Sequence, residues 1–133
     1  MLQKVLVIDD SRFQIQVLRM ALEKRGFEVL AALDTAQAGI FARHHIPQAI
    51  VLDINMPGGS GIDVLKRLKR STKTQNIPVI VVSGNEDPDI KNVALQLGAK
   101  LFLAKPVDTE QLCAAITRLL TPAATLKLEE AAP

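Results

Sequence analysis

The sequence contains no tryptophan and no tyrosine, and its four aromatic residues are all phenylalanine. The interior must therefore be built from Val, Ile, Leu and Ala. The single cysteine, Cys113, excludes an internal disulfide and fits a reducing compartment. No apolar run approaches the ~20 residues of a membrane span, and the start MLQKVLVIDD is too short and too soon acidic for a secretory signal. We expect a soluble, cytoplasmic protein without membrane insertion.

Neither sign of charge predominates in the sequence. Sixteen basic and 14 acidic residues leave a net charge of +2, which is too small and too scattered to predict nucleic-acid binding. At 133 residues the chain has the length of one domain. We place that domain at residues 1–121 and interpret residues 122–133, PAATLKLEEAAP, as a flexible tail or the start of a linker.

Short apolar runs alternate along the chain with longer helical patterns. The runs are KVLVI, EVLAA, AIVL, VIVV and KLFL, at 4–8, 28–32, 49–52, 79–82 and 100–103. Continuous runs rich in β-branched residues are typical of strands that are covered on both faces, as in parallel sheets. Five such units predict an α/β fold, a doubly wound (βα)5 parallel sheet with the flavodoxin-like strand order 2-1-3-4-5.

Helix signals lie between these runs. A capping residue followed three positions later by glutamine predicts three helix N-termini, at Ser11–Gln14, Asp34–Gln37 and Asp108–Gln111. A third helix is predicted over 62–70, and a fourth from Asp87-Pro88 to Gly98. We interpret the basic residues at the end of the third helix as a solvated surface; they are Lys66, Arg67, Lys69, Arg70 and Lys73.

Polar side chains stand where the predicted strands end: Asp9 and Asp10, then Asp53, Ser83 and Lys105. Because the carboxyl ends of parallel strands share one edge of the sheet, we expect the three carboxylates to converge. At about 4 Å such carboxylates repel one another by about 4 kcal/mol per pair. Either some stay protonated or a cation joins them, and oxygen-only ligation favours Mg²⁺, with Mn²⁺ as an alternative.

A carboxylate with a divalent ion on one side, and an ammonium and a hydroxyl on the other, suits a phosphoryl group. Asp53 would be the nucleophile, since carboxylates can form acyl phosphates. The loop PGGSG at 57–61 follows at once. We expect it to wrap closely around the site, with Gly58, Gly59 and Gly61 permitting the necessary backbone dihedrals.

The pattern resembles the receiver domain of bacterial two-component response regulators, in its stand-alone single-domain form. VLVIDD, VLDINMPGGSG, VIVVSG and GAKLFLAKPV occur in the family's order and at its spacing, over most of the chain. The resemblance implies that Asp53 is the phosphoacceptor. It implies that Asp9, Asp10 and Asp53 hold Mg²⁺ together with the backbone carbonyl of Asn55, Asp10 being the more direct ligand of the acidic pair.

The resemblance further implies that Ser83 and Lys105 bind the phosphoryl group and that the bond before Pro106 is cis. Phe102 falls at the family's switch aromatic, which turns inward when the hydroxyl of Ser83 moves. A histidine kinase or phosphotransfer protein would be the donor. The face of the fourth helix, fifth strand and fifth helix would change its affinity for an unknown protein target, in a monomer or a phosphorylation-linked dimer. The protein would not be a turnover enzyme, although it would assist its own phosphorylation and dephosphorylation.

Three other interpretations remain open. An aspartyl-phosphate phosphohydrolase of the haloacid-dehalogenase pattern needs a second acid two residues after the nucleophile, where this chain has Asn55. A flavodoxin-type flavin carrier is disfavoured by Asp9-Asp10 in place of a phosphate loop, and by the lack of Trp or Tyr to stack on the flavin. A phosphorylation-independent pseudo-receiver would act as a binding module in spite of its intact acids.

Overall fold

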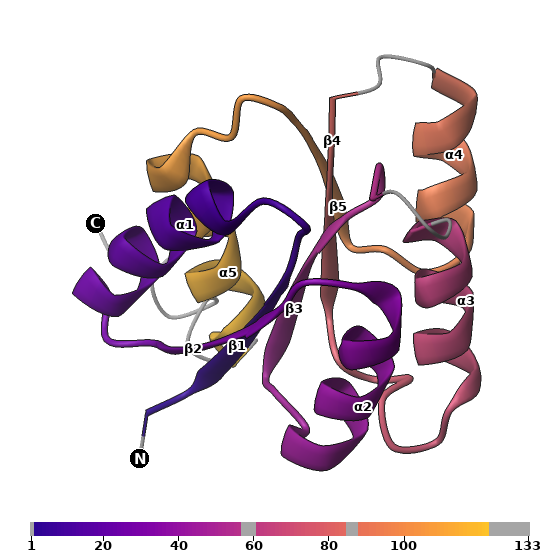
Figure 1. The fold of residues 1–133 in the computed structure, drawn as a ribbon, viewed down its shortest axis with the longest axis horizontal. Helices are drawn as coiled ribbons and strands as arrows, with labels where there is room; N and C mark the ends of the chain where they lie inside the picture. Colours follow the sequence, from indigo (N-terminus) through magenta and orange to yellow (C-terminus); the bar gives the residue numbers. More distant parts are fainter. Residues whose placement is uncertain (1, 57–60, 85–87, 123–133) are drawn as a thin grey trace.

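The computed structural model describes residues 2–56, 61–84 and 88–122 as five strands that alternate with five helices (Figure 1). The strands are β1 (Lys4–Ile8), β2 (Glu28–Ala32), β3 (Ala49–Asp53), β4 (Val79–Ser83) and β5 (Leu101–Ala104). The helices are α1 (Arg12–Lys24), α2 (Thr35–His45), α3 (Gly61–Arg70), α4 (Pro88–Gln96) and α5 (Thr109–Leu120). None of these helices has the length and apolar character needed to cross a bilayer.

The strands form one sheet of order β2-β1-β3-β4-β5, and every neighbouring pair is parallel. The predicted α/β fold and its strand order are confirmed. The order reverses at β1, from which the chain goes outward to β2 and then crosses back to β3. In such sheets the crevice at the carboxyl ends of the strands beside that reversal is where ligands bind.

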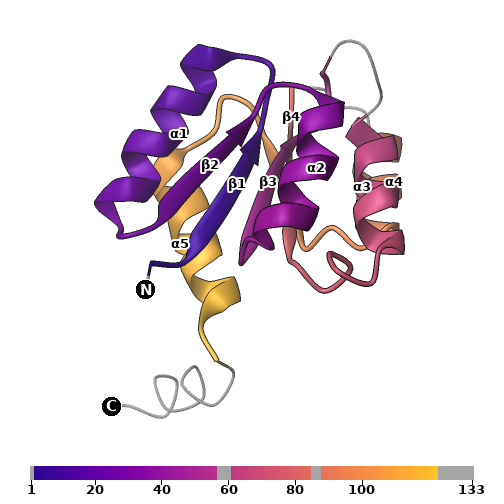
Figure 2. The same cartoon turned by 60° about the horizontal axis from the view of Figure 1, so that its bottom comes forward.

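Alternate residues of each strand point to opposite faces of the sheet, so the protein has two apolar layers. One layer contains Leu6, Ile50 and Leu52 and packs against α2, α3 and α4. The other contains Val7 and Val51 and packs against α1 and α5. Figure 2 shows the two groups of helices on opposite sides of the sheet.

The capping signals explain where three helices begin. The side chains of Ser11, Asp34 and Asp108 each accept a hydrogen bond from the backbone N–H three residues on, at 3.1, 2.8 and 3.1 Å. The reciprocal half of a capping box is absent at Ser11, whose own N–H donates to Oδ1 of Asp9 at 2.9 Å. The first helix is therefore tied directly to the edge of the sheet where the polar residues gather.

Some expected boundaries were wrong by one residue. Strands β3 and β4 each extend one residue further, to Asp53 and Ser83, because these residues still lie in the ladder: Asp53 is in register with Val82, and Ser83 with Ala104. Strand β5 starts and ends one residue later than expected, and α3 begins at Gly61.

Coverage of the strands on both faces holds only for the inner strands. Every residue of β3 and β4 is buried, but β2 and β5 lie at the edges and are only partly covered. Apolar composition alone does not distinguish an edge strand from a central one.

The predictions for Gly58, Gly59, the Asp87 cap and the tail after Pro122 concern segments outside the described residues.

Lys69 is partly exposed and makes specific contacts that the interpretation of this helix end as a solvated surface did not include. Its ammonium donates hydrogen bonds to the carbonyl oxygens of Gln75 (3.2 Å) and Ile77 (3.0 Å), which lie in the connection to β4. Burial, and then the neighbouring charge of Lys100, lower the pKa of Lys69 below its usual value. This lysine therefore fastens the α3–β4 connection, a role that a run of basic letters cannot show.

Candidate functional site

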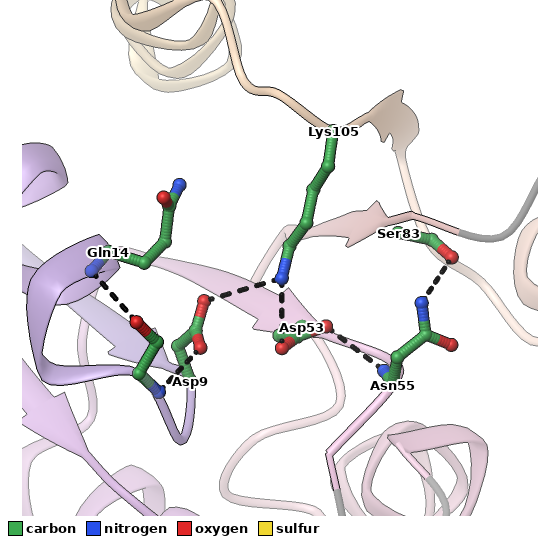
Figure 3. Close-up of polar contacts among 7 residues, drawn as sticks. Asp9, Gln14, Asp53, Asn55, Ser83 and Lys105 are labelled. Carbon is green, nitrogen blue, oxygen red and sulfur yellow. Dashed lines mark hydrogen bonds and ion pairs between the residues drawn. The ribbon is translucent and has the colours of Figure 1, made fainter.

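The side chains of Asp9, Asp53, Ser83 and Lys105 meet at the carboxyl edge of the sheet (Figure 3). Asp53 and Ser83 end β3 and β4, which lie side by side. Asp9 follows β1 on the other side of β3, and Lys105 follows β5. Each of these residues stands at the carboxyl end of a strand. Because the strands are parallel, their carboxyl ends lie at the same edge of the sheet, and residues as far apart in sequence as 9 and 105 come together there.

Three carboxylates share one small space. Asp9, Asp10 and Asp53 each present one oxygen to it, and these oxygens lie within 4.8 Å of one another. Asp9 and Asp53 are buried, whereas Asp10 is exposed. The cluster is therefore buried on the side of the sheet and reachable from solvent on the side of Asp10.

Both oxygens of Asp53 have a defined partner. Oδ1 accepts a hydrogen bond from the backbone N–H of Asn55 at 3.0 Å, and Oδ2 lies 3.1 Å from the Nζ of Lys105. The side chain of Asp53 is only 4% exposed. Charge-assisted contacts of this length orient a carboxylate as well as stabilise its charge.

Lys105 bridges two of the acids. Its Nζ also lies 3.8 Å from Oδ2 of Asp9, and its backbone N–H donates to the carbonyl oxygen of Ser83 at 2.9 Å. The Lys105–Pro106 peptide bond is cis, as the resemblance implied. The ammonium therefore lies between the ends of β1 and β3, although it is carried by the segment after the edge strand β5.

The surroundings of Asp9 oppose its ionisation. Burial raises the pKa of its carboxyl, and the negative charges of Asp53 and Asp10 raise it further. The backbone hydrogen bond from Ser11 and the charge of Lys105 lower this pKa, but they do not cancel the effect of burial. The groups around Asp9 therefore do not fully offset the cost of burying it as an anion.

A divalent cation fits this donor set. The available ligands are carboxylate oxygens, with no histidine or cysteine among the clustered residues. Oxygen-only ligation is the preference of hard ions such as Mg²⁺, and a bound cation would offset the burial and repulsion that oppose ionisation of Asp9.

Asn55 connects Asp53 with Ser83. While its backbone N–H binds Asp53, its side-chain Nδ2 donates a hydrogen bond to Oγ of Ser83 at 3.0 Å. Ser83 is 1% exposed, whereas Asn55 is exposed. Sequence reasoning placed Asn55 beside the site through its backbone carbonyl but missed this side-chain contact, which depends on how far the β3 and β4 ends lie apart.

Gly61 is required by close packing rather than by a special dihedral angle. Its N–H donates to the carbonyl oxygen of Ile54 at 3.3 Å, and an added Cβ would overlap the backbone of Ile54, with that oxygen at 2.7 Å. Among the described glycines, positive φ occurs at Gly26 and Gly98 and not at Gly61. The first residue of α3 thus lies directly against the end of β3, and close packing rather than backbone dihedral freedom is what requires glycine at this position.

Residues 5–117 match the family described as the response regulator receiver domain. The chain belongs to this family. Protein PilH of Pseudomonas aeruginosa is 34% identical to it over 117 residues, which cover 88% of this chain and 97% of PilH. The phosphate regulon transcriptional regulatory protein PhoB of the same species is 34% identical over 116 residues, covering 87% of this chain but only 51% of PhoB. The receiver domain thus spans about half the length of that relative.

Solved receiver structures have the same fold. The chemotaxis response regulator CheY4 of Vibrio cholerae superposes with a TM-score of 0.83 at 28% identity, covering 90% of this chain and all of CheY4. The receiver domain of the Francisella response regulator 1452 gives a TM-score of 0.81 at 30% identity, covering 88% of this chain and 95% of that domain. Membership of the receiver domain family, inferred from four sequence motifs, is confirmed.

Phe102, the residue at the receiver family's switch position, lies on β5 in register with Val81. Its ring is half-buried and packs against the apolar layer under α2, α3 and α4. The position therefore lies between solvent and core. Its role in switching remains a prediction.

Proposed function

We propose that this receiver domain is a phosphorylation-dependent signalling switch that accepts a phosphoryl group on Asp53. The observation that carries the proposal is the position of Asp53, which is buried among two further carboxylates with its Oδ2 3.1 Å from Lys105 Nζ. A carboxylate in this setting has a cation on one side and, on the other, an acidic cluster that could hold a divalent ion. With such an ion bound, positive charge would flank the phosphoryl group, which is what phosphoryl transfer requires.

In the forward step, a carboxylate oxygen of Asp53 attacks the phosphorus of a phosphohistidine. The O–P bond forms, the P–N bond breaks, and the imidazole leaves with the electron pair. Lys105 neutralises charge on the phosphoryl oxygens, and the hydroxyl of Ser83 donates a hydrogen bond to one of them. In the separate hydrolysis step, water attacks phosphorus, the P–O bond to Asp53 breaks, and the carboxylate is restored as inorganic phosphate leaves.

Asp9, Asp10, Asp53 and the backbone carbonyl of Asn55 are the groups that would hold Mg²⁺. When bound, the ion supplies positive charge to the phosphoryl oxygens opposite Lys105. The residues themselves provide the oxygen ligands, and Lys105 keeps the remaining charge of Asp9 and Asp53 balanced while the group is transferred.

The donor is a histidine kinase or a phosphotransfer protein, and the readout is a change of affinity for a protein target through α4, β5 and α5. Ser83 and Phe102 would link the two: the hydroxyl moves toward the phosphoryl group, and the ring of Phe102 turns further into the apolar layer that it already contacts. Because phenylalanine has no hydroxyl, burial of the ring is the only signal that it can transmit.

The decisive experiment is labelling with a small phosphodonor such as acetyl phosphate. We expect Mg²⁺-dependent labelling of the unaltered protein and none of Asp53→Asn, which keeps the shape of the side chain. Asp63→Asn, which removes an exposed acid from α3, is the matched control and should label normally. Labelling of Asp53→Asn would contradict the assignment of the acceptor.

Partner capture distinguishes a switch from a pseudo-receiver. We expect the beryllofluoride-treated protein to retain a partner that Asp53→Ala does not retain. Equal retention by both would favour a phosphorylation-independent binding module. Steady release of phosphate from an external phosphomonoester would favour the phosphohydrolase, which the carboxamide at Asn55 disfavours because it cannot act as a general acid.

A further inference from the structure

The side chain of Asn55 bonds to a group that must change its partner if the switch operates. Its Nδ2 donates to Oγ of Ser83 at 3.0 Å, and Figure 3 shows the hydroxyl directed toward Asn55. The backbone N–H of the same residue donates to Oδ1 of Asp53 at 3.0 Å. One residue thus holds both the carboxylate that ends β3 and the hydroxyl that ends β4.

The two ends of this hydrogen bond have different surroundings. Ser83 is 1% exposed and is the last residue of a fully buried strand, with its carbonyl oxygen bonded to the N–H of Lys105. Asn55 is exposed and lies beyond the end of β3. The backbone of Ser83 is therefore held at the end of the ladder, whereas its hydroxyl contacts an exposed residue, Asn55, whose carboxamide can be solvated when the contact breaks.

We propose that Asn55 is a positioning residue whose carboxamide holds the hydroxyl of Ser83 in the unphosphorylated conformation. This inference rests on the proposed phosphorylation of Asp53. When a phosphoryl oxygen on Asp53 draws the hydroxyl toward it, the Asn55–Ser83 hydrogen bond breaks and the carboxamide is solvated. The contact therefore opposes occupancy of the site, and its removal should make the phosphorylated conformation easier to reach.

The expected change in affinity for a phosphoryl analogue follows from the exchange of one hydrogen bond, between Asn55 and Ser83, for solvation of the carboxamide. A neutral hydrogen bond of typical net strength changes an equilibrium by about fivefold. Asn55→Ala leaves the backbone N–H and carbonyl in place, so both the bond to Asp53 and the carbonyl proposed for the metal are retained. We expect this variant to bind beryllofluoride with Mg²⁺ about fivefold more tightly than the unaltered protein. Asn76→Ala, which removes an exposed asparagine before β4, should bind as the unaltered protein does.

A double-mutant cycle shows whether Asn55 acts through Ser83. Beryllofluoride affinity is measured by NMR titration for the unaltered protein, Asn55→Ala, Ser83→Ala and the double variant. We expect the gain from Asn55→Ala to disappear in the Ser83→Ala background. A gain that persists there, or an affinity that falls in Asn55→Ala while Ser83 is present, would overturn the proposal.

The contact itself is testable without any phosphoryl analogue. In the free protein, Ser83→Ala should move the side-chain amide signals of Asn55 toward the values of a solvated carboxamide, and beryllofluoride should do the same in the unaltered protein. Unmoved signals in Ser83→Ala would overturn the contact. If Ser83→Ala moves them but beryllofluoride does not bind the unaltered protein at all, the proposed phosphorylation fails, and with it the switching role of Asn55, while the resting hydrogen bond stands.

Discussion

The central strand β3 and the edge strand β5 both supply the site, but they hold their residues very differently. All five residues of β3 are buried, and the strand is paired with β1 and β4. Strand β5 is paired with β4 in the sheet, and none of its residues is buried. The side chain of Asp53 is accordingly 4% exposed and that of Lys105 is 30% exposed. The proposed acceptor is fixed by the core, whereas its counter-charge has room to adjust as the group on Asp53 changes.

Truncation of one leucine in each strand would test this difference directly, with the largest expected effect. Leu52 of β3 is fully buried, whereas Leu103 of β5 is half-buried. We expect Leu52→Ala to lower the free energy of unfolding by about 3 kcal/mol and Leu103→Ala by about 1 kcal/mol. Urea denaturation measures both. Equal losses would show that the edge strand is held as firmly as the centre.

Two glycines, one at the start of α3 and one directly after β4, offer a second, smaller contrast. A Cβ at Gly61 would overlap the backbone of Ile54, whereas a Cβ at Gly84 would meet nothing within 4 Å. Gly61→Ala should lower the free energy of unfolding by about 1–3 kcal/mol, and Gly84→Ala should change it by less than about 0.5 kcal/mol. Thermal unfolding of the two variants measures the difference. If Gly61→Ala proves neutral, the backbone around Ile54 must relax to accept the added Cβ.

The buried acid beside β3, Asp9, predicts how the free energy of unfolding changes with pH in metal-free solution. Because the pKa of Asp9 is raised in the folded protein, the folded state holds that proton more tightly than the unfolded state does. The stability that Asp9 contributes is complete below its ordinary pKa of 3.8 and is lost as the pH rises through the raised value. Asp9→Asn removes this loss and keeps an acceptor for the N–H of Ser11.

The Asn variant should therefore be more stable than the unaltered protein at neutral pH, with a difference that grows with pH across that window. Denaturation with a chelator present, at several pH values, measures the difference. Added Mg²⁺ should reduce it by stabilising the unaltered protein, and a difference that is constant with pH would contradict the electrostatic cause.

The smallest effect is expected far from β3, on the surface between α1 and α5. Arg25 and Glu110 form an ion pair there, with side chains 38% and 81% exposed. Exposed pairs contribute about 0.2–1 kcal/mol and are screened by salt. Arg25→Gln should lower the free energy of unfolding by no more than that, and the loss should diminish in concentrated salt. A loss larger than that of Leu103→Ala would reverse the gradient from centre to edge.

Local sequence patterns predicted most of the fold because their causes are local. The capping pairs at Ser11, Asp34 and Asp108 begin three helices as expected, and the five apolar runs are the five strands. The left-handed φ of 44° at Ile46, which follows the last residue of α2, had no sequence signal, because this conformation favours glycine over a β-branched residue.

Within the site, the residue types and their places at strand ends were predictable, but their contacts were not. From the sequence alone, Asp9, Asp53 and Lys105 predict a cluster of charged side chains. The hydrogen bond from Asn55 to Ser83 and those from Lys69 to the connection before β4 were not anticipated. Both join side chains to groups six or more residues away, and both depend on distances that no local pattern contains.

The sequence by itself determined the alternation of strands and helices, the parallel sheet and the gathering of acids at one edge, because hydrophobic periodicity and helix capping act over a few residues. Only the tertiary structure decided which strand is shielded and which is exposed, which glycine is pressed against a backbone, and which hydroxyl Asn55 holds. Those outcomes depend on how separate elements pack, and packing is set by the whole chain at once.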